Sequence, residues 1–225
     1  ILLISVVGTA QTTIWESESE DYASWIFEDL DGDSDSWFYD PSGDSLGFDF
    51  TGTVFASSAS DTAPNNILKS PTFLIDATLT TLNFQMRIGN AIGAPFKDET
   101  YAVYVYDVAT NPTGDYTTET PILSTSAIAD SSSEIVTAII PSSFAGKTVG
   151  LIIRHFNINN GTLGNILIVD DFKVDSPITL STQNNNIENL SFFPNPVSDI
   201  VTLQTPANLN TVIVYNQLGQ RLLTF

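Results

Sequence analysis

Residues 81–88 read TLNFQMRI, and residues 101–108 read YAVYVYDV. In the first stretch, apolar and polar side chains alternate, which is typical of a strand with one side against a core. The apolar positions are Leu82, Phe84, Met86 and Ile88. The second stretch is aromatic and β-branched, which is typical of a strand. These two stretches predict a β-sheet protein.

Further stretches of the same kind lie at residues 135–140, 149–156 and 166–174, with turn residues such as Asn159-Asn160-Gly161 between them. A long period of 3.6 residues, which would indicate a helix, is missing from the sequence. Short strands without helices favour a sandwich or a barrel. We therefore expect an all-β jelly-roll sandwich over residues 11–175, because an immunoglobulin domain needs only about 100 residues.

Composition excludes several classes of function. The chain has 225 residues, a formal net charge of −19 and no cysteine. With 7 Lys and Arg against 26 Asp and Glu, it would repel the phosphates of nucleic acids. The lack of cysteine excludes disulfides, thiolate metal sites and cysteine nucleophiles. An acidic, cysteine-free chain with local Asp clusters instead suggests an extracellular protein that binds a hard cation.

The first ten residues, ILLISVVGTA, form an apolar run that ends in small residues. This order is typical of the end of a secretory signal peptide, with cleavage before Gln11. The run is too short to span a bilayer, and we expect no transmembrane segment. The alternative is a buried first strand.

A polar stretch at residues 176–188 reads as a linker, because it holds an Asn run and one Pro. A smaller β unit follows over residues 189–225, with strands near 201–203 and 211–215. It begins with the rigid turn Phe193-Pro194-Asn195-Pro196. A unit of this length can barely support its own core, so we expect a truncated, immunoglobulin-like sandwich.

The most suggestive chemistry is an acidic loop in which Asp29, Asp31 and Asp33 alternate with Leu30 and Gly32. Carboxylates that repel one another favour a cation, and Ca²⁺ takes 6–8 oxygen ligands. An EF-hand is rejected, because the positions that should hold Gly and Glu hold Ser34 and Asp40. The sequence predicts a sandwich-type calcium site, and the alternative is a solvated acidic turn.

A second carboxylate pair, Asp170-Asp171, lies in the last predicted strand. If Ile168, Phe172 and Val174 line the core, then Asp170 lies on the same face. A buried carboxylate needs a metal or strong donors, so both residues are candidate metal ligands. The alternative is that Asp170 caps the end of the strand.

Catalysis finds little support. His155 is the only histidine, and we expect it at an edge or surface position. No Ser-His-Asp arrangement follows from spacing, and no common catalytic or nucleotide motif occurs. The three Trp residues, Trp15, Trp25 and Trp37, fit core packing better than an exposed sugar platform. We expect no enzyme, and a glycoside hydrolase is the least favoured alternative.

Two resemblances extend these inferences. Residues 193–219, with Phe193-Pro194-Asn195-Pro196 and Val214-Tyr215-Asn216 running to Gly219, resemble the type A C-terminal sorting domain of the Bacteroidetes type IX secretion system. That resemblance implies export through an outer-membrane translocon and display on, or release from, the cell surface. The closing strands of such domains are missing here, which fits truncation.

The larger unit resembles the cleaved-adhesin, or choice-of-anchor J, family. The matching elements, in order, are the Asp loop between Trp25 and Trp37, Asn65-Asn66-Ile67-Leu68-Lys69-Ser70-Pro71, Phe144-Ala145-Gly146-Lys147, and Ile168-Val169-Asp170-Asp171-Phe172. The resemblance implies a jelly roll related to MAM and carbohydrate-binding modules. It also implies structural calcium, with Asp170 and Asp171 completing the site that the Asp loop begins.

Together these features predict a secreted or surface-exposed, adhesin-like binding module, stabilised by Ca²⁺ and exported by type IX secretion. Its expected partners are a glycan or a host or matrix protein, besides the secretion machinery. The alternative is a structural component of the surface or matrix without a discrete ligand.

Overall fold

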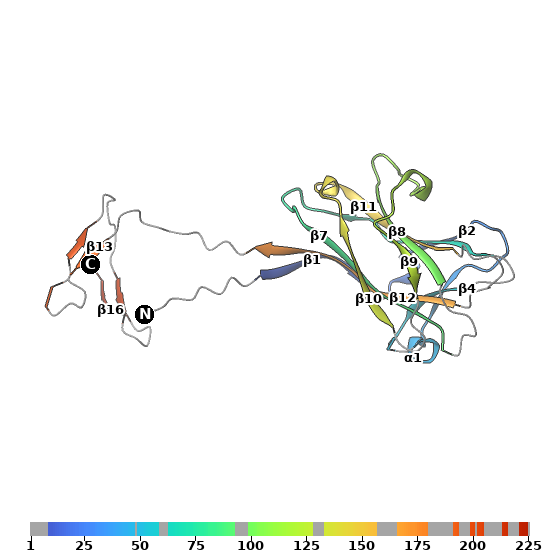
Figure 1. The fold of residues 1–225 in the computed structure, drawn as a ribbon, viewed down its shortest axis with the longest axis horizontal. Helices are drawn as coiled ribbons and strands as arrows, with labels where there is room; N and C mark the ends of the chain where they lie inside the picture. Colours follow the sequence, from blue (N-terminus) through green and yellow to red (C-terminus); the bar gives the residue numbers. More distant parts are fainter. Residues whose placement is uncertain are drawn as a thin grey trace. The chain divides into compact units, whose positions relative to one another are not determined.

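The computed structural model describes residues 9–47, 49–58, 63–92, 99–127, 133–156, 166–179, 191–193, 199–200, 202–204, 213–215 and 221–224. Contacts divide the chain into a large unit, residues 1–179, and a small unit, residues 180–225. Figure 1 labels the main strands of both units.

The large unit contains two antiparallel sheets of six strands each. Sheet A comprises β1 (Thr9–Ser17), β3 (Trp37–Asp40), β4 (Val54–Ser58), β7 (Leu82–Asn90), β10 (Glu134–Ile140) and β12 (Ile166–Thr179). Sheet B comprises β2 (Ile26–Asp29), β5 (Asn65–Lys69), β6 (Phe73–Leu74), β8 (Glu99–Asp107), β9 (Leu123–Ala127) and β11 (Thr148–Phe156). The strand orders are β10-β7-β12-β4-β3, with β1 beside β12, and β2-β5-β11-β8-β9, with β6 beside β11. The expected all-β jelly-roll sandwich is confirmed.

Helices are short and lie in the connections. They are α1 (Gly43–Leu46) and the 3₁₀ turns η1 (Tyr22–Ser24), η2 (Tyr116–Thr118) and η3 (Ser142–Phe144). None of the helices in the described ranges is long and apolar enough to cross a membrane.

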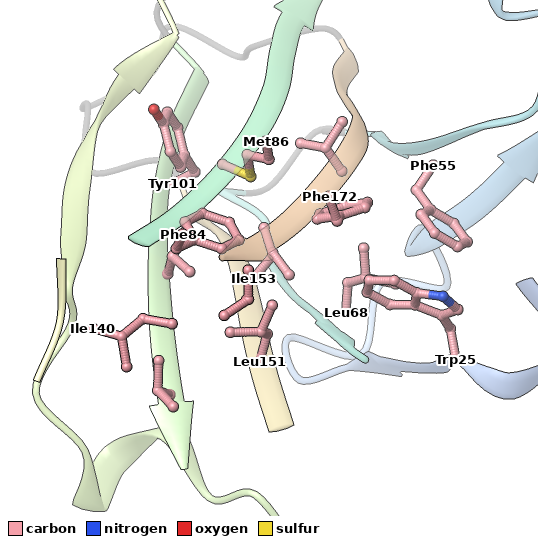
Figure 2. Packing of buried hydrophobic residues seen from close by; sticks show 14 of the residues in the cluster. Trp25, Phe55, Leu68, Phe84, Met86, Tyr101, Ile140, Leu151, Ile153 and Phe172 are labelled. Carbon is pink, nitrogen blue, oxygen red and sulfur yellow. The ribbon is translucent and has the colours of Figure 1, made fainter. Parts of the chain in front are cut away.

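The core lies between the two sheets. The four apolar side chains predicted to share a face of β7 are fully buried, whereas the residues between them are only partly buried. They meet inward side chains of sheet B, such as Val103, Leu151 and Ile153. Figure 2 shows Phe84, Met86 and Phe172 facing this layer, with Trp25 and Phe55 at one end.

The first and last strands of the large unit are neighbours. β1 pairs with the second half of β12, so that Thr9 lies opposite Thr179 and Ser17 lies opposite Phe172. In Figure 1 the two strands run side by side, in blue and orange. β12 thus extends through the first four residues of the predicted linker, and β1 includes the last two residues of the predicted signal peptide. Residues 1–8 lie outside the described residues.

The described residues of the small unit form two pairs of antiparallel strands. β13 (Ser191–Phe193) pairs with β14 (Thr202–Gln204), and β15 (Ile213–Tyr215) pairs with β16 (Arg221–Thr224). Strands were predicted near two of these positions. Residues 194–196 of the predicted rigid turn and residues 216–219 lie outside the described residues.

Candidate functional site

The acidic loop follows directly from the end of β2 at Asp29. One carboxylate oxygen from each of Asp29, Asp31 and Asp33 lies within 4.8 Å of the others. Gly32 and Ser34 both have positive φ, at 75° and 77°, and this tight path folds the loop back on itself. The backbone N–H groups of these two residues donate to Asp29, at 2.7 Å and 3.0 Å. The loop therefore gathers the three carboxylates that the sequence singled out.

The carboxylates of the loop differ in electrostatics. The backbone N–H of Gly32 lowers the pKa of Asp29 by stabilising its charged form. Burial raises the pKa of Asp31, and the neighbouring Asp29 raises it further. A divalent cation would reverse the effect on Asp31, because it favours every carboxylate in its charged form.

The loop is suited to a hard cation. Calcium binds oxygen at 2.3–2.6 Å, so two oxygens on one ion lie no more than about 5.2 Å apart. The separations among Asp29, Asp31 and Asp33 fall within that limit. The donor set is all oxygen, as calcium and magnesium prefer.

Asp170 and Asp171 lie elsewhere, on β12 of sheet A, and do not join the group in the acidic loop. Asp170 is 3% exposed and accepts a hydrogen bond of 2.7 Å from Ser19 Oγ. Burial raises its pKa to about 7. Asp171 forms an ion pair of 2.7 Å with Arg87. Protein groups thus serve as partners for both carboxylates.

The burial of Asp170 was predicted, but the face on which it lies was not. Asp171 has a φ of 50°, and the pairing of β12 with β7 shifts between Asp170 and Lys173. This bulge breaks the alternation. Phe172 and Val174 therefore point into the core between the sheets, whereas Ile168 packs in a separate cluster with Phe50. Asp170 lies on the same side of β12 as Ile168, which is the outer side, opposite Phe172 and Val174.

The expectation that His155 lies at an edge or on the surface is wrong. β11 is a central strand of sheet B, and the His155 side chain is fully buried. Nδ1 lies 2.8 Å from Ser57 Oγ on sheet A, and Nε2 lies 2.7 Å from Glu99 Oε2 on β8. Glu99 and Ser57 are fully buried too. A Ser, a His and an acid thus meet in the interior of the described structure, where their contacts link sheet A to sheet B.

The tryptophans pack as predicted. Trp25 and Trp37 are 6% and 3% exposed and belong to the core. Trp15 is partly buried and stacks on Phe73, with 4.9 Å between the ring centroids. These contacts favour a structural role over an exposed platform for sugars.

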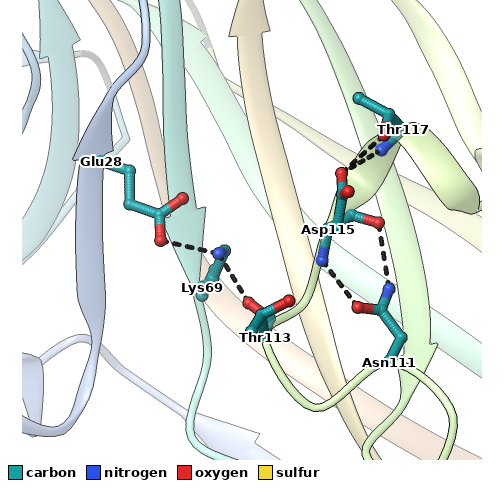
Figure 3. A network of polar contacts seen from close by, with 6 residues as sticks. All are labelled: Glu28, Lys69, Asn111, Thr113, Asp115 and Thr117. Carbon is teal, nitrogen blue, oxygen red and sulfur yellow. Dashed lines mark hydrogen bonds and ion pairs between the residues drawn. The ribbon is translucent and has the colours of Figure 1, made fainter.

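The outer side of sheet B is covered by the chain itself. Residues 108–122 fold over a set of outward side chains that we call the covered face, which consists of Ile67, Ala102, Tyr104, Tyr106 and Ile152. The Tyr116 ring lies 5.8 Å from that of Tyr104. The carbonyl of Thr113 accepts a hydrogen bond of 2.9 Å from Lys69 Nζ, which also pairs with Glu28 at 2.7 Å. Figure 3 shows this attachment and the hydrogen bonds of Asn111 and Asp115 that hold the segment together.

The outer side of sheet A is different over β10, β7 and the second half of β12. Its outward residues, which we call the open face, are Asn83, Gln85, Arg87, Ile135, Thr137, Ile139, Lys173 and Asp175. Two hollows lie there, one lined by Asn83 and Thr137, the other by Arg87 and Lys173, and Gln85 lines both. Ile135 and Ile139 are 43% and 65% exposed. This surface was not among the predicted sites, although it is the polar half of the same alternation that predicted β7.

The model of the Cleaved Adhesin Domain family matches residues 11–174. No curated protein sequence matches the chain. Among solved structures, the K3 cleaved adhesin domain of Lys-gingipain from Porphyromonas gingivalis W83 shares 18% identity, with a TM-score of 0.51 over 74% of this chain and 99% of that one. The K1 domain of Lys-gingipain shares 19% identity, with a TM-score of 0.51 over 75% of this chain and 98% of that one. The K2 domain shares 19% identity, with a TM-score of 0.52 over 73% of this chain and 99% of that one. At this identity, the structures show a shared fold.

Proposed function

The chain belongs to the Cleaved Adhesin Domain family, and from this premise we propose that it is a binding module that acts outside the cell and holds a glycan or an extracellular protein. The observation that carries the proposal is the family match over residues 11–174, which spans nearly the whole two-sheet unit. The burial of Ser57, His155 and Glu99 further favours binding over hydrolysis, because a catalytic group must reach its substrate.

The direct test is binding by the full chain. The protein is screened in calcium against a panel of glycans and against extracellular matrix proteins. Saturable binding to one of them is expected. Surface display without saturable binding would instead favour a structural component of the cell surface.

We further propose that Asp29, Asp31 and Asp33 hold a Ca²⁺ ion that stabilises the loop after β2. Their mutual separation of no more than 4.8 Å supports this assignment. Calcium that binds only the folded state stabilises it by about 2.7 kcal/mol at a hundredfold excess over Kd.

Asp31→Asn combined with Asp33→Asn should therefore lower the melting temperature in calcium and leave it nearly unchanged in EDTA. Calorimetric titration of the chelator-stripped protein should show about one equivalent of calcium, which the double variant loses. Equal destabilisation in calcium and in EDTA would reduce the loop to a solvated turn.

We also propose that the two ends of the chain serve export, with residues 1–10 from a signal peptide and residues 189–225 from a type IX sorting domain. The motif at residues 193–219 supports this role. Deletion of residues 189–225 should keep the protein inside a Bacteroidetes host, as judged by surface immunolabelling. Unchanged surface labelling would contradict the proposal.

A further inference from the structure

A partly exposed arginine on the outer side of sheet B lies close to two aromatic rings. Arg154 comes from β11, beyond the covered face, and its guanidinium carbon lies 4.6 Å from the centroid of the Tyr116 ring. The same carbon lies 4.4 Å from the centroid of the Phe156 ring. Both rings are themselves partly exposed. The rings attract the cation and help to hold it in place.

One side of the guanidinium is fixed by a neighbour. Nε donates a hydrogen bond of 2.7 Å to Oδ1 of Asn65 on β5. Arginine carries five N–H donors in a fixed plane, and four of them belong to the two terminal nitrogens. Within the described residues, those terminal nitrogens have no hydrogen-bond acceptor. The free donors therefore point along the plane of the group, in the arrangement that binds a carboxylate through two parallel hydrogen bonds.

Arg154 differs from the other described cations of the large unit in its ion pairing. The chain carries 26 acidic residues, and the other cations described in the large unit all pair with one of them. The pairs are Lys69–Glu28, Arg87–Asp171, Lys147–Asp107 and Lys173–Asp175. Arg154 forms no ion pair with any described residue of this unit. In a protein with this excess of carboxylates, its position leaves it available for a carboxylate from outside.

We propose that Arg154, with Tyr116 and Phe156 beside it, binds the carboxylate of an acidic sugar in an extracellular glycan. The assignment rests on the proposed function and names its ligand class. The carboxylate would lie in the guanidinium plane, and the C–H groups of the sugar ring would contact the aromatic rings.

A sugar acid suits this site better than an acidic peptide side chain. Its carboxylate is attached directly to a rigid ring, whereas an Asp or Glu side chain loses conformational freedom when it is held. The net negative charge of the protein weakens the attraction only modestly at physiological salt, because charges beyond about 8 Å are screened.

The experiment measures binding of two acidic probes to the full chain by calorimetry in calcium and 0.15 M salt. The probes are trigalacturonic acid and 3′-sialyllactose, each beside its neutral counterpart, the methyl ester and lactose. We expect the protein to bind at least one acid and to prefer it to its neutral form by about tenfold or more.

The variants are Arg154→Gln, Arg154→Lys and a matched control, Lys147→Gln. Lys147 also lies over an aromatic ring, 5.6 Å from that of Phe144, but it is paired with Asp107 at 3.0 Å. Arg154→Gln should weaken binding of the acid by about tenfold or more, whereas Lys147→Gln should change it less than about twofold. Arg154→Lys keeps the charge but lacks the planar donors, so a loss of binding at an unchanged melting temperature assigns the effect to the guanidinium geometry.

Several outcomes would overturn the inference. Equal affinity for acidic and neutral probes would remove the role of the carboxylate, and equal losses in Arg154→Gln and Lys147→Gln would reduce it to net charge. Binding of a Glu-rich peptide in place of either sugar would move the site to protein ligands. If a neutral glycan binds and a substitution at Gln85 alone abolishes it, the proposed function stands and this inference fails. If no glycan binds, the inference fails and only the protein branch of the proposed function remains.

Discussion

The outer sides of the two sheets contrast sharply. On sheet B, Tyr104 and Tyr106 point outward, yet residues 108–122 cover them to 7% and 6% exposure. On sheet A, outward Ile135 and Ile139 remain 43% and 65% exposed among polar neighbours. Both sheets obey the same alternation of side chains. They differ in what the outward positions carry.

The contrast between the two faces shows that the covered face contributes to stability, whereas the open face carries the surface chemistry. Outward aromatic and aliphatic side chains on sheet B favour a covering segment, because its folding removes apolar area from water. Outward amides and ion pairs on sheet A gain little from being covered, because they would have to give up water. We therefore expect the covered face to behave as part of the core and the open face to behave as surface.

The largest expected effect comes from Tyr106→Ala on the covered face. Tyr106 is packed between Gly114 in the covering segment and Gly150 on β11, and a Cβ at Gly114 would lie 3.1 Å from the ring. Loss of the ring should lower the free energy of unfolding by about 3–5 kcal/mol, as for other buried aromatic residues. Urea denaturation at neutral pH measures it.

Its control is Gln85→Ala on the open face, which should change stability by less than about 0.5 kcal/mol. A similar loss in both variants would show that the two faces are not distinct.

The second effect concerns Asp170, which lies buried on the outer side of β12 beneath Ser19. Its pKa in the folded state is about 7, above the ordinary 3.8, because burial disfavours the charge. The folded protein therefore holds more protons than the unfolded chain between about pH 4 and pH 7, and stability from this group falls as the pH rises through that window.

Asp170→Asn removes the titrating group and keeps an acceptor for Ser19. The difference in free energy of unfolding between the variant and the unmodified protein should be about 1–3 kcal/mol more in favour of the variant at pH 8 than at pH 5. Urea denaturation at both pH values, in EDTA, measures this difference. The same pH dependence in the variant would show that another group is responsible.

The smallest expected effect on stability comes from replacing two lysines, one on each sheet. Lys69 is nearly buried beneath the covering segment and serves both Glu28 and the Thr113 carbonyl. Lys69→Met should cost about 1–2 kcal/mol, because it leaves both partners without their donor.

On the open face, Lys173 Nζ lies 3.8 Å from Asp175, which also accepts a hydrogen bond from Asn83. Lys173→Met should cost less than Lys69→Met, because its ion pair is long and the buried Asp175 keeps its hydrogen bond from Asn83. Thermal melting of the two variants side by side gives the comparison, and a reversed order would contradict it.

The strands could be predicted from the sequence because alternation is local. The expected strands at 81–88 and 149–156 differ by no more than two residues at either end from β7 and β11. The acidic loop could be predicted for the same reason, since its three carboxylates lie within five residues and Gly32 supplies the turn.

What failed depended on distant or irregular structure. The bulge at Asp171 has no clear sequence signal, because a non-glycine residue with positive φ is uncommon. It places Asp170 on the side of the strand opposite Phe172, where a shared face was predicted. The partners of His155 lie 56 and 98 residues away in the chain. The cover over Tyr106 comes from a turn-rich segment whose sequence resembles any loop. Each needed the tertiary arrangement.

The pairing of β1 with β12 has a mechanical consequence. Thr9 and Thr179 lie opposite each other at the same end of an antiparallel ladder. A force that pulls these two ends apart would peel the ladder open one pair at a time, because the hydrogen bonds are loaded in sequence. In a force experiment with handles at these two residues, we expect a low-force extension before the main unfolding step, and a single high-force step would contradict it. A module built this way yields to tension at its terminal strand first, while the layer between the two sheets still bears no load.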